Sequence, residues 1–191
     1  MQNLFQQDDI KFDKLIKYSL AIDDVGHMIR VGELSLMIAE TLGVKDTDII
    51  YTSGRLHDIG KAYVNPTILN KRGKLADTEF NVIKRHVFFS AYYAIVNGCN
   101  IEIAYNLLLH HENYDGSGYP FGLKGDSIPL GARIIRVADV YDALTMDRPY
   151  RSKLKLSEAI ETMEKEKKNF DMTVFETFKE YIIDRQIREV I

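Results

Sequence analysis

Apolar residues recur every three or four positions along most of the chain, which is the period of an amphipathic helix. In one such segment, Val31, Leu34 and Ile38 fall on a single helical face. The pattern predicts helices over residues 10–22, 27–42, 47–58, 78–97, 101–112, 131–145, 157–168 and 172–189. No segment alternates with a period of two over enough residues to predict a strand. We therefore expect an all-α fold, a bundle of about seven or eight helices.

Capping residues and two connections complete this prediction. The expected helix caps are Asp46, Asp77, Ser157 and Asp171. Residues 61–76, with Pro66 and Gly73, are expected to form a connector. Residues 113–130 form a second, Gly-rich loop, and residues 116–131 hold five of the chain's 12 glycines and two of its four prolines. A loop of this length is uncommon in a compact domain unless it is functional, so we expect it to serve a site.

Composition and charge narrow the class of protein. The chain has 191 residues, of which 46% are apolar and 28% charged, and this favours a single domain over residues 1–191. Its net charge of −3 leaves no overall basic surface for a DNA or RNA polymer. Cys99 is the single cysteine, which excludes an internal disulfide and a cysteine-only metal site. Neither a signal peptide nor an apolar stretch approaching the roughly 18–20 residues of a membrane span is visible, so we expect a cytoplasmic protein.

Histidines and carboxylates are the candidate chemistry. The five histidines are His27, His57, His86, His110 and His111, all on predicted helices. One such histidine alone is usually a core or surface residue. Two adjacent pairs, His57–Asp58 and His110–His111, lie at predicted helix ends. Because neighbouring helical residues project about 100° apart, each pair holds either one metal at a helix end or two metals of a cluster.

Asp139 and Asp142 lie one turn apart on a predicted helix, on the same face as Ile135, so they are expected to point inward. Buried carboxylates need a compensating metal ion or arginine. The candidate arginines are Arg133, Arg136 and Arg148. Imidazole and carboxylate ligands suit divalent Fe, Mn, Zn or Ni. The spacing therefore favours a mixed His/Asp metal site, without fixing the number of ions or the substrate.

These residues fall into the motifs of a known family. Residues 57–61 read HDIGK, residues 110–120 read HHENYDGSGYP, residues 137–145 read VADVYDALT and residues 148–151 read RPYR. Residues 27–30 add an HxxR element and residues 84–86 a KxH element. In order and spacing, the chain resembles the HD-GYP family of HD-domain metal-dependent phosphohydrolases. The resemblance covers roughly residues 20–180.

The resemblance implies a ligand set and a helical HD-domain bundle with a long GYP loop. It assigns one metal to His27, His57, Asp58 and Asp139, and a second to His86, His110 and His111 with Asp58 bridging. The two ions are expected to be Fe or Mn. A third ion, bound by Asp23, is left open, since an acid at a helix start is usually a cap.

The remaining roles also follow from the resemblance. Lys61 is expected to bind the scissile phosphate and stabilise its developing charge, and Asp142 to lie near the metal water or a guanine. Tyr119, Arg148 and Arg151 are expected to contact substrate. Glu112 is expected to orient His111. Lys61, Asp58 and Asp142 are thus the predicted catalytic residues.

The activity implied is a cyclic di-GMP phosphodiesterase, in which a metal-bridging hydroxide at a His/Asp di-metal site yields pGpG and/or GMP. The alternatives are a hydrolase of another cyclic dinucleotide or nucleotide, and a catalytically silent cyclic di-GMP-binding or scaffold protein. A signalling-protein partner or a homodimer is also considered. The aromatic residues Phe88, Phe89, Tyr92 and Tyr93 are expected to pack in the core, with a dimer face as the alternative.

Overall fold

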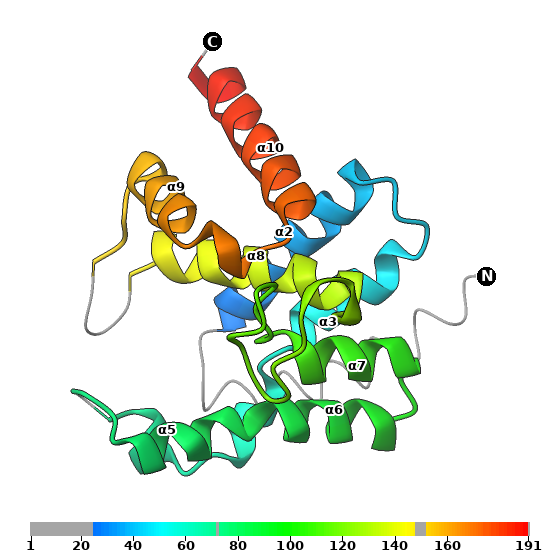
Figure 1. The fold of residues 1–191 in the computed structure, drawn as a ribbon, viewed down its shortest axis with the longest axis vertical. Coiled ribbons are helices and arrows are strands. Elements are labelled where there is room, and N and C mark those ends of the chain that lie inside the picture. Colours follow the sequence, from blue (N-terminus) through cyan, green and yellow to red (C-terminus); the bar gives the residue numbers. More distant parts are fainter. Residues whose placement is uncertain (1–24, 72, 148–151, 191) are drawn as a thin grey trace.

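The computed structural model describes residues 25–71, 73–147 and 152–190, the last six of these by their backbone only. Over these ranges it contains no strand, and eight helices of eight residues or more confirm the all-α prediction (Figure 1). The helices are α2 (Val25–Thr41), α3 (Thr47–Leu56), α5 (Asp77–Lys84), α6 (His86–Val96), α7 (Ile101–Leu109), α8 (Leu130–Thr145), α9 (Leu156–Lys165) and α10 (Met172–Val190). None of these helices is both long and apolar enough to cross a membrane. The helix expected over residues 10–22 lies outside the described residues.

Two apolar cores hold the helices together. The larger core lies among α2, α8, α9 and α10, where Val31, Ile135 and Phe175 are completely buried. The smaller core lies among α3, α6 and α7, around Leu56 and Leu107. Figure 1 shows α8 running across the middle of the molecule, with α9 and α10 on one side and α5, α6 and α7 on the other. Helix α8 contacts α9 and α10 on one side and α3 and α7 on the other, so it joins the two cores.

The single long helix expected over residues 78–97 is wrong, because the chain breaks at Arg85 into α5 and α6. The Arg85 N–H donates to the Val82 carbonyl, 3.2 Å away, which tightens the last turn of α5. The Nδ1 of His86 lies 2.8 Å from the Ile83 carbonyl. The side chain thereby satisfies a carbonyl that the end of α5 leaves free. The break places His86 at the start of α6, where its ring is buried.

The connector expected over residues 61–76 has more structure than predicted. It begins within the 3-10 helix η1 (Ile59–Tyr63) and contains a one-turn helix, α4 (Pro66–Leu69). Asn65 caps α4 by accepting the Thr67 N–H at 2.9 Å, and Pro66 occupies the first helical position, where its missing N–H costs nothing.

Two of the predicted caps, Asp77 and Ser157, are wrong, because Ala76 and Lys155 occupy the N-cap positions. Asp46 occupies the N-cap position of α3, as predicted, but its side chain makes no capping hydrogen bond. In α5 and α9, glutamates in the first turn satisfy the free N–H groups instead. Glu79 accepts the N–H of Ala76 at 2.7 Å, and Glu158 accepts that of Lys155 at 2.9 Å. The Asp171 cap is confirmed, because its carboxylate accepts two N–H groups from the first turn of α10.

Two aromatic residues of α6 were predicted to pack in the core, and this prediction is wrong. Phe88 is 46% exposed and Tyr92 is 61% exposed. The Phe88 ring meets that of Phe121 edge to face, with centroids 6.2 Å apart. Because helix α6 buries its opposite face against α7, this face stays open. Its use as a dimer face remains a prediction.

A close backbone approach between η1 and α6 fixes the segment that follows α3. The Gly60 N–H donates to the Ser90 Oγ at 2.9 Å, and that hydroxyl donates to the His57 carbonyl at 2.8 Å. A Cβ on Gly60 would lie 2.1 Å from the His86 carbonyl oxygen and 2.6 Å from the Ser90 nitrogen. Only a residue without a side chain fits there, so the HDIGK segment is held directly against α6.

Replacing Gly60 by alanine should therefore force η1 away from α6. We expect Gly60→Ala to lower the free energy of unfolding by about 1–3 kcal/mol, as overpacking of a tight contact does. Urea unfolding followed by circular dichroism measures this change. The control is Gly98→Asn, since that position has a φ of 73° with open space and asparagine tolerates it. Equal stability of Gly60→Ala and the parent protein would contradict the assignment.

Candidate metal centre

Three of the predicted histidine ligands are held by the ends of helices. His57 follows α3, His110 follows α7, and His86 follows α5 after the break at Arg85. In each case Nδ1 lies 2.7–2.8 Å from the carbonyl oxygen three residues earlier, on Gly54, Leu107 and Ile83 respectively. A carbonyl oxygen only accepts hydrogen bonds, so Nδ1 carries the proton in all three. Each Nε2 is thereby left with a free lone pair, as a metal ligand requires.

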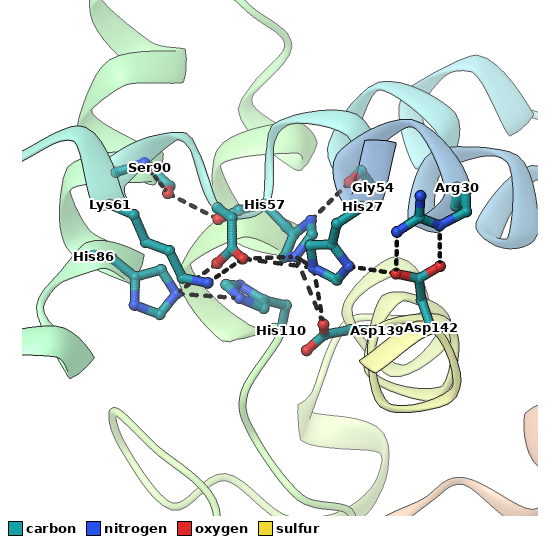
Figure 2. Close-up of polar contacts among 12 residues, drawn as sticks. His27, Arg30, Gly54, His57, Lys61, His86, Ser90, His110, Asp139 and Asp142 are labelled. Carbon is teal, nitrogen blue, oxygen red and sulfur yellow. Dashed lines mark hydrogen bonds and ion pairs between the residues drawn. The ribbon is translucent and has the colours of Figure 1, made fainter. Parts of the chain in front are cut away.

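These lone pairs converge with the carboxylates in one buried cluster (Figure 2). Two groups have ligand atoms within 4.8 Å of one another, namely His27, His57 and Asp139, and Asp58, His86, His110 and His111. Asp58 joins the groups, because its Oδ2 lies 3.3 Å from the His57 Nε2 and its Oδ1 lies 3.3 Å from the His86 Nε2. The structure therefore brings together all seven predicted ligands that it describes.

The two acidic residues of α8 share a face, as predicted, but they have different partners. Asp139 Oδ1 lies 3.3 Å from the His27 Nε2, within the cluster. The Asp142 carboxylate accepts the His27 Nδ1 at 2.7 Å and the Arg30 Nε at 2.6 Å. The pairing of these acids with Arg133 or Arg136 is wrong, and Arg148 lies outside the described residues. Asp142 thus reaches the cluster by orienting His27, while its contact with substrate stays a prediction.

The protonation states suit metal binding. Burial lowers the pKa of His110 and of His111 well below the usual value, so both imidazoles are neutral at neutral pH. Burial by itself would raise the pKa of the Asp58 carboxyl, but above all the positive charge of Lys61 holds it well below its usual value. Neutral imidazoles and an ionised carboxylate are the forms that bind a metal.

His27 shows where a positive charge is favoured. Burial would lower the pKa of His27, but hydrogen bonds to Asp139, Asp142 and Asp58 outweigh it and raise the pKa to about 11. The carboxylates thus stabilise a cation beside the His27 Nε2. A divalent ion would replace that proton and supply more charge.

Two further observations show that the residues fit a metal. Asp58 Oδ1 is buried and accepts no hydrogen bond, although such atoms rarely stay unsatisfied. The Nε2 atoms of His86 and His110 lie 3.4 Å apart, each Nδ1 already being used by a carbonyl. The C-terminal ends of α3, α5 and α7 add partial negative charge, which also favours cations. The cluster can therefore bind metal ions.

Lys61 and Tyr119 lie beside this cluster. The Lys61 Nζ is 2.5 Å from Asp58 Oδ2, and its side chain is only 19% exposed, so it is not an ordinary solvated lysine. The Tyr119 ring stacks on that of His111, with centroids 4.8 Å apart. Burial is the main reason that the pKa of the Tyr119 hydroxyl rises above its usual range, and the Asp58 charge adds to it. A positive charge and an aromatic face thus border the ligands.

The Gly-rich loop is confirmed as irregular, with one 3-10 turn, η2 (Gly125–Ser127), between α7 and α8. Glu112 anchors it, which corrects the expectation that this residue orients His111. The buried Glu112 carboxylate accepts the N–H groups of Phe121, Gly122 and Leu123 at 2.7–3.1 Å. Gly118 packs so closely that a Cβ there would lie 2.2 Å from the Asn113 nitrogen. The loop is therefore tied to the end of α7 behind the ligand pair.

Two roles were not predicted, those of Arg30 on Asp142 and of Glu112 on the loop. The signal for Arg30 was its position one turn after His27, which places both on one face of α2. For Glu112 no local signal existed, since its partners follow nine to eleven residues later. Three predicted site residues, Asp23, Arg148 and Arg151, lie outside the described residues, and their roles stay predictions.

The comparisons with known proteins agree with this geometry. The HD domain family model matches residues 15–174. The chain is 40% identical over 158 residues to the "Cyclic di-GMP phosphodiesterase PA4108" of Pseudomonas aeruginosa, covering 80% of this chain and 37% of that protein. It is 43% identical over 145 residues to the "3'3'-cGAMP-specific phosphodiesterase 1" of Vibrio cholerae, covering 73% and 33% respectively. The chain thus spans about a third of the length of these curated relatives.

A solved structure shares the fold. "Bd1817, a HDG"Y"P protein from Bdellovibrio bacteriovorus" superposes with a TM-score of 0.66 at 20% identity, over 82% of this chain and 51% of that one. At this identity the likeness concerns the fold, which is the helical bundle that the sequence predicted.

The contact between Asp142 and His27 predicts a change in metal affinity. Asp142→Asn replaces one acceptor oxygen by a donor and removes the charge beside Nδ1, so His27 loses its fixed orientation. We expect affinity for Mn(II) to fall by about 10- to 100-fold, as is typical when such a partner is lost. Competition with a chelator measures it, with Asp126→Asn as a control at an exposed carboxylate. Unchanged affinity would refute the positioning role.

The Glu112 contacts predict the rigidity of the loop. Glu112→Gln replaces an acceptor oxygen by an NH2 group and weakens the bonds to the three backbone N–H groups. We expect hydrogen exchange of residues 121–123 to quicken by about tenfold, the value of one charge-assisted hydrogen bond. Asp115→Asn, which alters a turn in the same loop, is the control and should leave these amides unaffected. Exchange at the parent rate would show that Glu112 does not anchor the loop.

Proposed function

The chain belongs to the HD domain family, in the branch with the HD-GYP motifs, and from this premise we propose that it is a metal-dependent phosphodiesterase of cyclic di-GMP. One observation carries the proposal. The seven His and Asp side chains named in the motifs converge in two groups, and Asp58 lies between them. The largely buried side chain of Lys61 contacts Asp58. The name of the Pseudomonas aeruginosa relative supports the substrate class.

The proposed cofactors are two divalent ions, Fe or Mn. His27, His57 and Asp139 would hold one, His86, His110 and His111 the other, and Asp58 both. The mixed nitrogen and oxygen donor set suits these ions. Divalent ions bound in this way activate water and neutralise charge on phosphoryl oxygens.

The residues of the chain supply the remaining functions. Lys61 places an ammonium group at Asp58, where it would bind the scissile phosphate and stabilise the charge that develops on its oxygens. Tyr119 presents an aromatic ring at His111, where it would contact the nucleotide. Asp142 and Arg30 hold His27 in place from behind. Cleavage of one phosphodiester would give pGpG, and a second cut would give GMP.

A second candidate substrate is 3'3'-cGAMP. The observation that favours it is the Vibrio cholerae relative of that name, which is as similar to this chain as the cyclic di-GMP phosphodiesterase is. Both substrates have two phosphodiesters in one ring and differ only in one base. A site built on metal ligands and a lysine acts on the shared phosphate, so the chemistry proposed is the same for both.

Turnover by the metal-loaded protein tests the proposal. After anaerobic reconstitution with Fe(II) or Mn(II), we expect release of pGpG or GMP from cyclic di-GMP, resolved by chromatography. His57→Ala and Asp58→Ala should each lose bound metal and reduce kcat by at least about a thousandfold, because both metals are needed for charge stabilisation. Lys165→Ala, at an exposed lysine of α9, is the control.

The outcomes separate the candidates. Faster turnover of 3'3'-cGAMP would select the second substrate. Binding of cyclic di-GMP without turnover by protein that contains two ions per chain would contradict the enzymatic proposal and favour a binding protein. Full activity of His57→Ala would disprove the assignment of the site.

A further inference from the structure

Two cations lie beside the loop segment of Tyr119 and have no part in the mechanism proposed above. The Lys84 Nζ lies 5.4 Å from the centroid of the Tyr119 ring and 4.7 Å from that of Phe80. The Arg136 Nε donates to Asn113 Oδ1 at 3.0 Å, and Asn113 begins the loop that carries Tyr119. One cation comes from α5 and the other from α8.

Both cations are close to metal ligands along their helices. Lys84 is the last residue of α5, two positions before His86. Arg136 precedes Asp139 by three positions on α8, so their side chains share a face. Arg136 also acts on the site electrostatically, because its charge adds to the effect of burial in lowering the pKa of His111.

Neither cation has an acidic partner among the described side chains. Among the side chains of residues 25–71, 73–147 and 152–184, no carboxylate oxygen lies within 4.0 Å of the Lys84 Nζ or the Arg136 guanidinium. Arg133, one turn earlier on α8, is different, since it pairs with Asp126 at 2.9 Å and Asp171 at 2.6 Å. Both cations are half-buried, so they have lost part of their hydration without gaining a counter-ion. This arrangement favours an anionic ligand.

The proposed substrate carries a second anionic group that these two cations could bind. Both phosphodiesters of a cyclic dinucleotide are ionised at neutral pH, and only one of them can lie against the metal ligands and Lys61. The other is tethered across the same ring and stays within one ring diameter. We propose that Arg136 and Lys84 bind this second phosphodiester, which is not being cut. The inference rests on the proposed function and assigns it a specificity for substrates with two phosphodiesters.

The two side chains suit this task in different ways. The Arg136 Nε is used by Asn113, while its two Nη groups donate to no acceptor among the described residues, so they remain for phosphate oxygens. Lys84, at the end of α5, places a compact positive charge over the face of the Tyr119 ring. The loop between them carries the aromatic ring, so one ligand could touch all three.

A purely structural role for Arg136 is the competing explanation. In that case Arg136 would act by anchoring Asn113 and hence the loop. Asn113→Ala removes this anchor and keeps the arginine charge, whereas Arg136→Lys keeps a charge and alters the anchor. The two variants therefore separate phosphate binding from loop anchoring.

The test compares two substrates of the Mn(II)-loaded protein. Cyclic di-GMP has two phosphodiesters, and bis(p-nitrophenyl) phosphate has one. For Arg136→Ala and for Lys84→Ala, we expect the ratio of kcat/KM for cyclic di-GMP to that for bis(p-nitrophenyl) phosphate to fall about tenfold each, the value of one charge-assisted contact. The loss should appear in KM for cyclic di-GMP. Arg136→Lys should recover part of the ratio, because it keeps the charge but loses the two Nη donors, and Lys165→Ala should keep the parent ratio.

Metal content and thermal unfolding of each variant show that the site is intact. A parental ratio in both alanine variants would overturn the inference and leave the proposed function standing, because bis(p-nitrophenyl) phosphate would still be hydrolysed. A fall in Asn113→Ala equal to that in Arg136→Ala would also overturn it, in favour of loop anchoring. If the metal-loaded parent hydrolyses neither substrate, the proposed function fails and takes the inference with it.

Discussion

The centre depends on one repeated hydrogen bond, from the Nδ1 of a histidine to the carbonyl three residues earlier at a helix end. Because a helix leaves its last carbonyls without partners, each of these ends both needs a donor and can orient a ring. The bond fixes the tautomer, aims Nε2 at the centre and satisfies the helix at once. The break at Arg85 follows from this requirement, since a continuous helix would use the Ile83 carbonyl itself.

The buried carboxylates around these rings carry negative charge that the neighbouring cationic side chains compensate only in part. Asp58 has Lys61 on one oxygen and no hydrogen bond on the other, and Asp139 faces His27. Asp142 is better supplied, since it accepts hydrogen bonds from His27 and twice from Arg30. A buried carboxylate left short of donors destabilises the fold by itself. The same uncompensated charge therefore destabilises the metal-free protein and favours the binding of cations.

Features set by residues close in the sequence could be predicted, whereas features set by contacts between distant residues could not. The helical period predicted the fold class and most helices. The motifs predicted the seven His and Asp side chains that the structure brings together, because His57–Asp58 and His110–His111 are fixed locally. The break at Arg85 was missed because residues 77–97 keep their apolar period through it, while a side chain decides where the helix ends. Arg30 was not among the arginines considered as alternative partners of Asp142, because it comes from a helix more than a hundred residues earlier. Glu112 was misread for the same reason, its partners lying across the loop.

The order of the ligands along the chain has a consequence for biosynthesis. His27 belongs to α2 and Asp139 to α8, and the other five ligands lie between them. No short stretch of the chain holds a complete ligand group, since even the second one extends from Asp58 to His111. A nascent chain therefore holds no complete group of these side chains until residues far apart in the sequence have been synthesised and packed together. The group that contains His27 is completed last, when α8 has left the ribosome and packs against α2, so its completion reports on the packing of α2, α3 and α8.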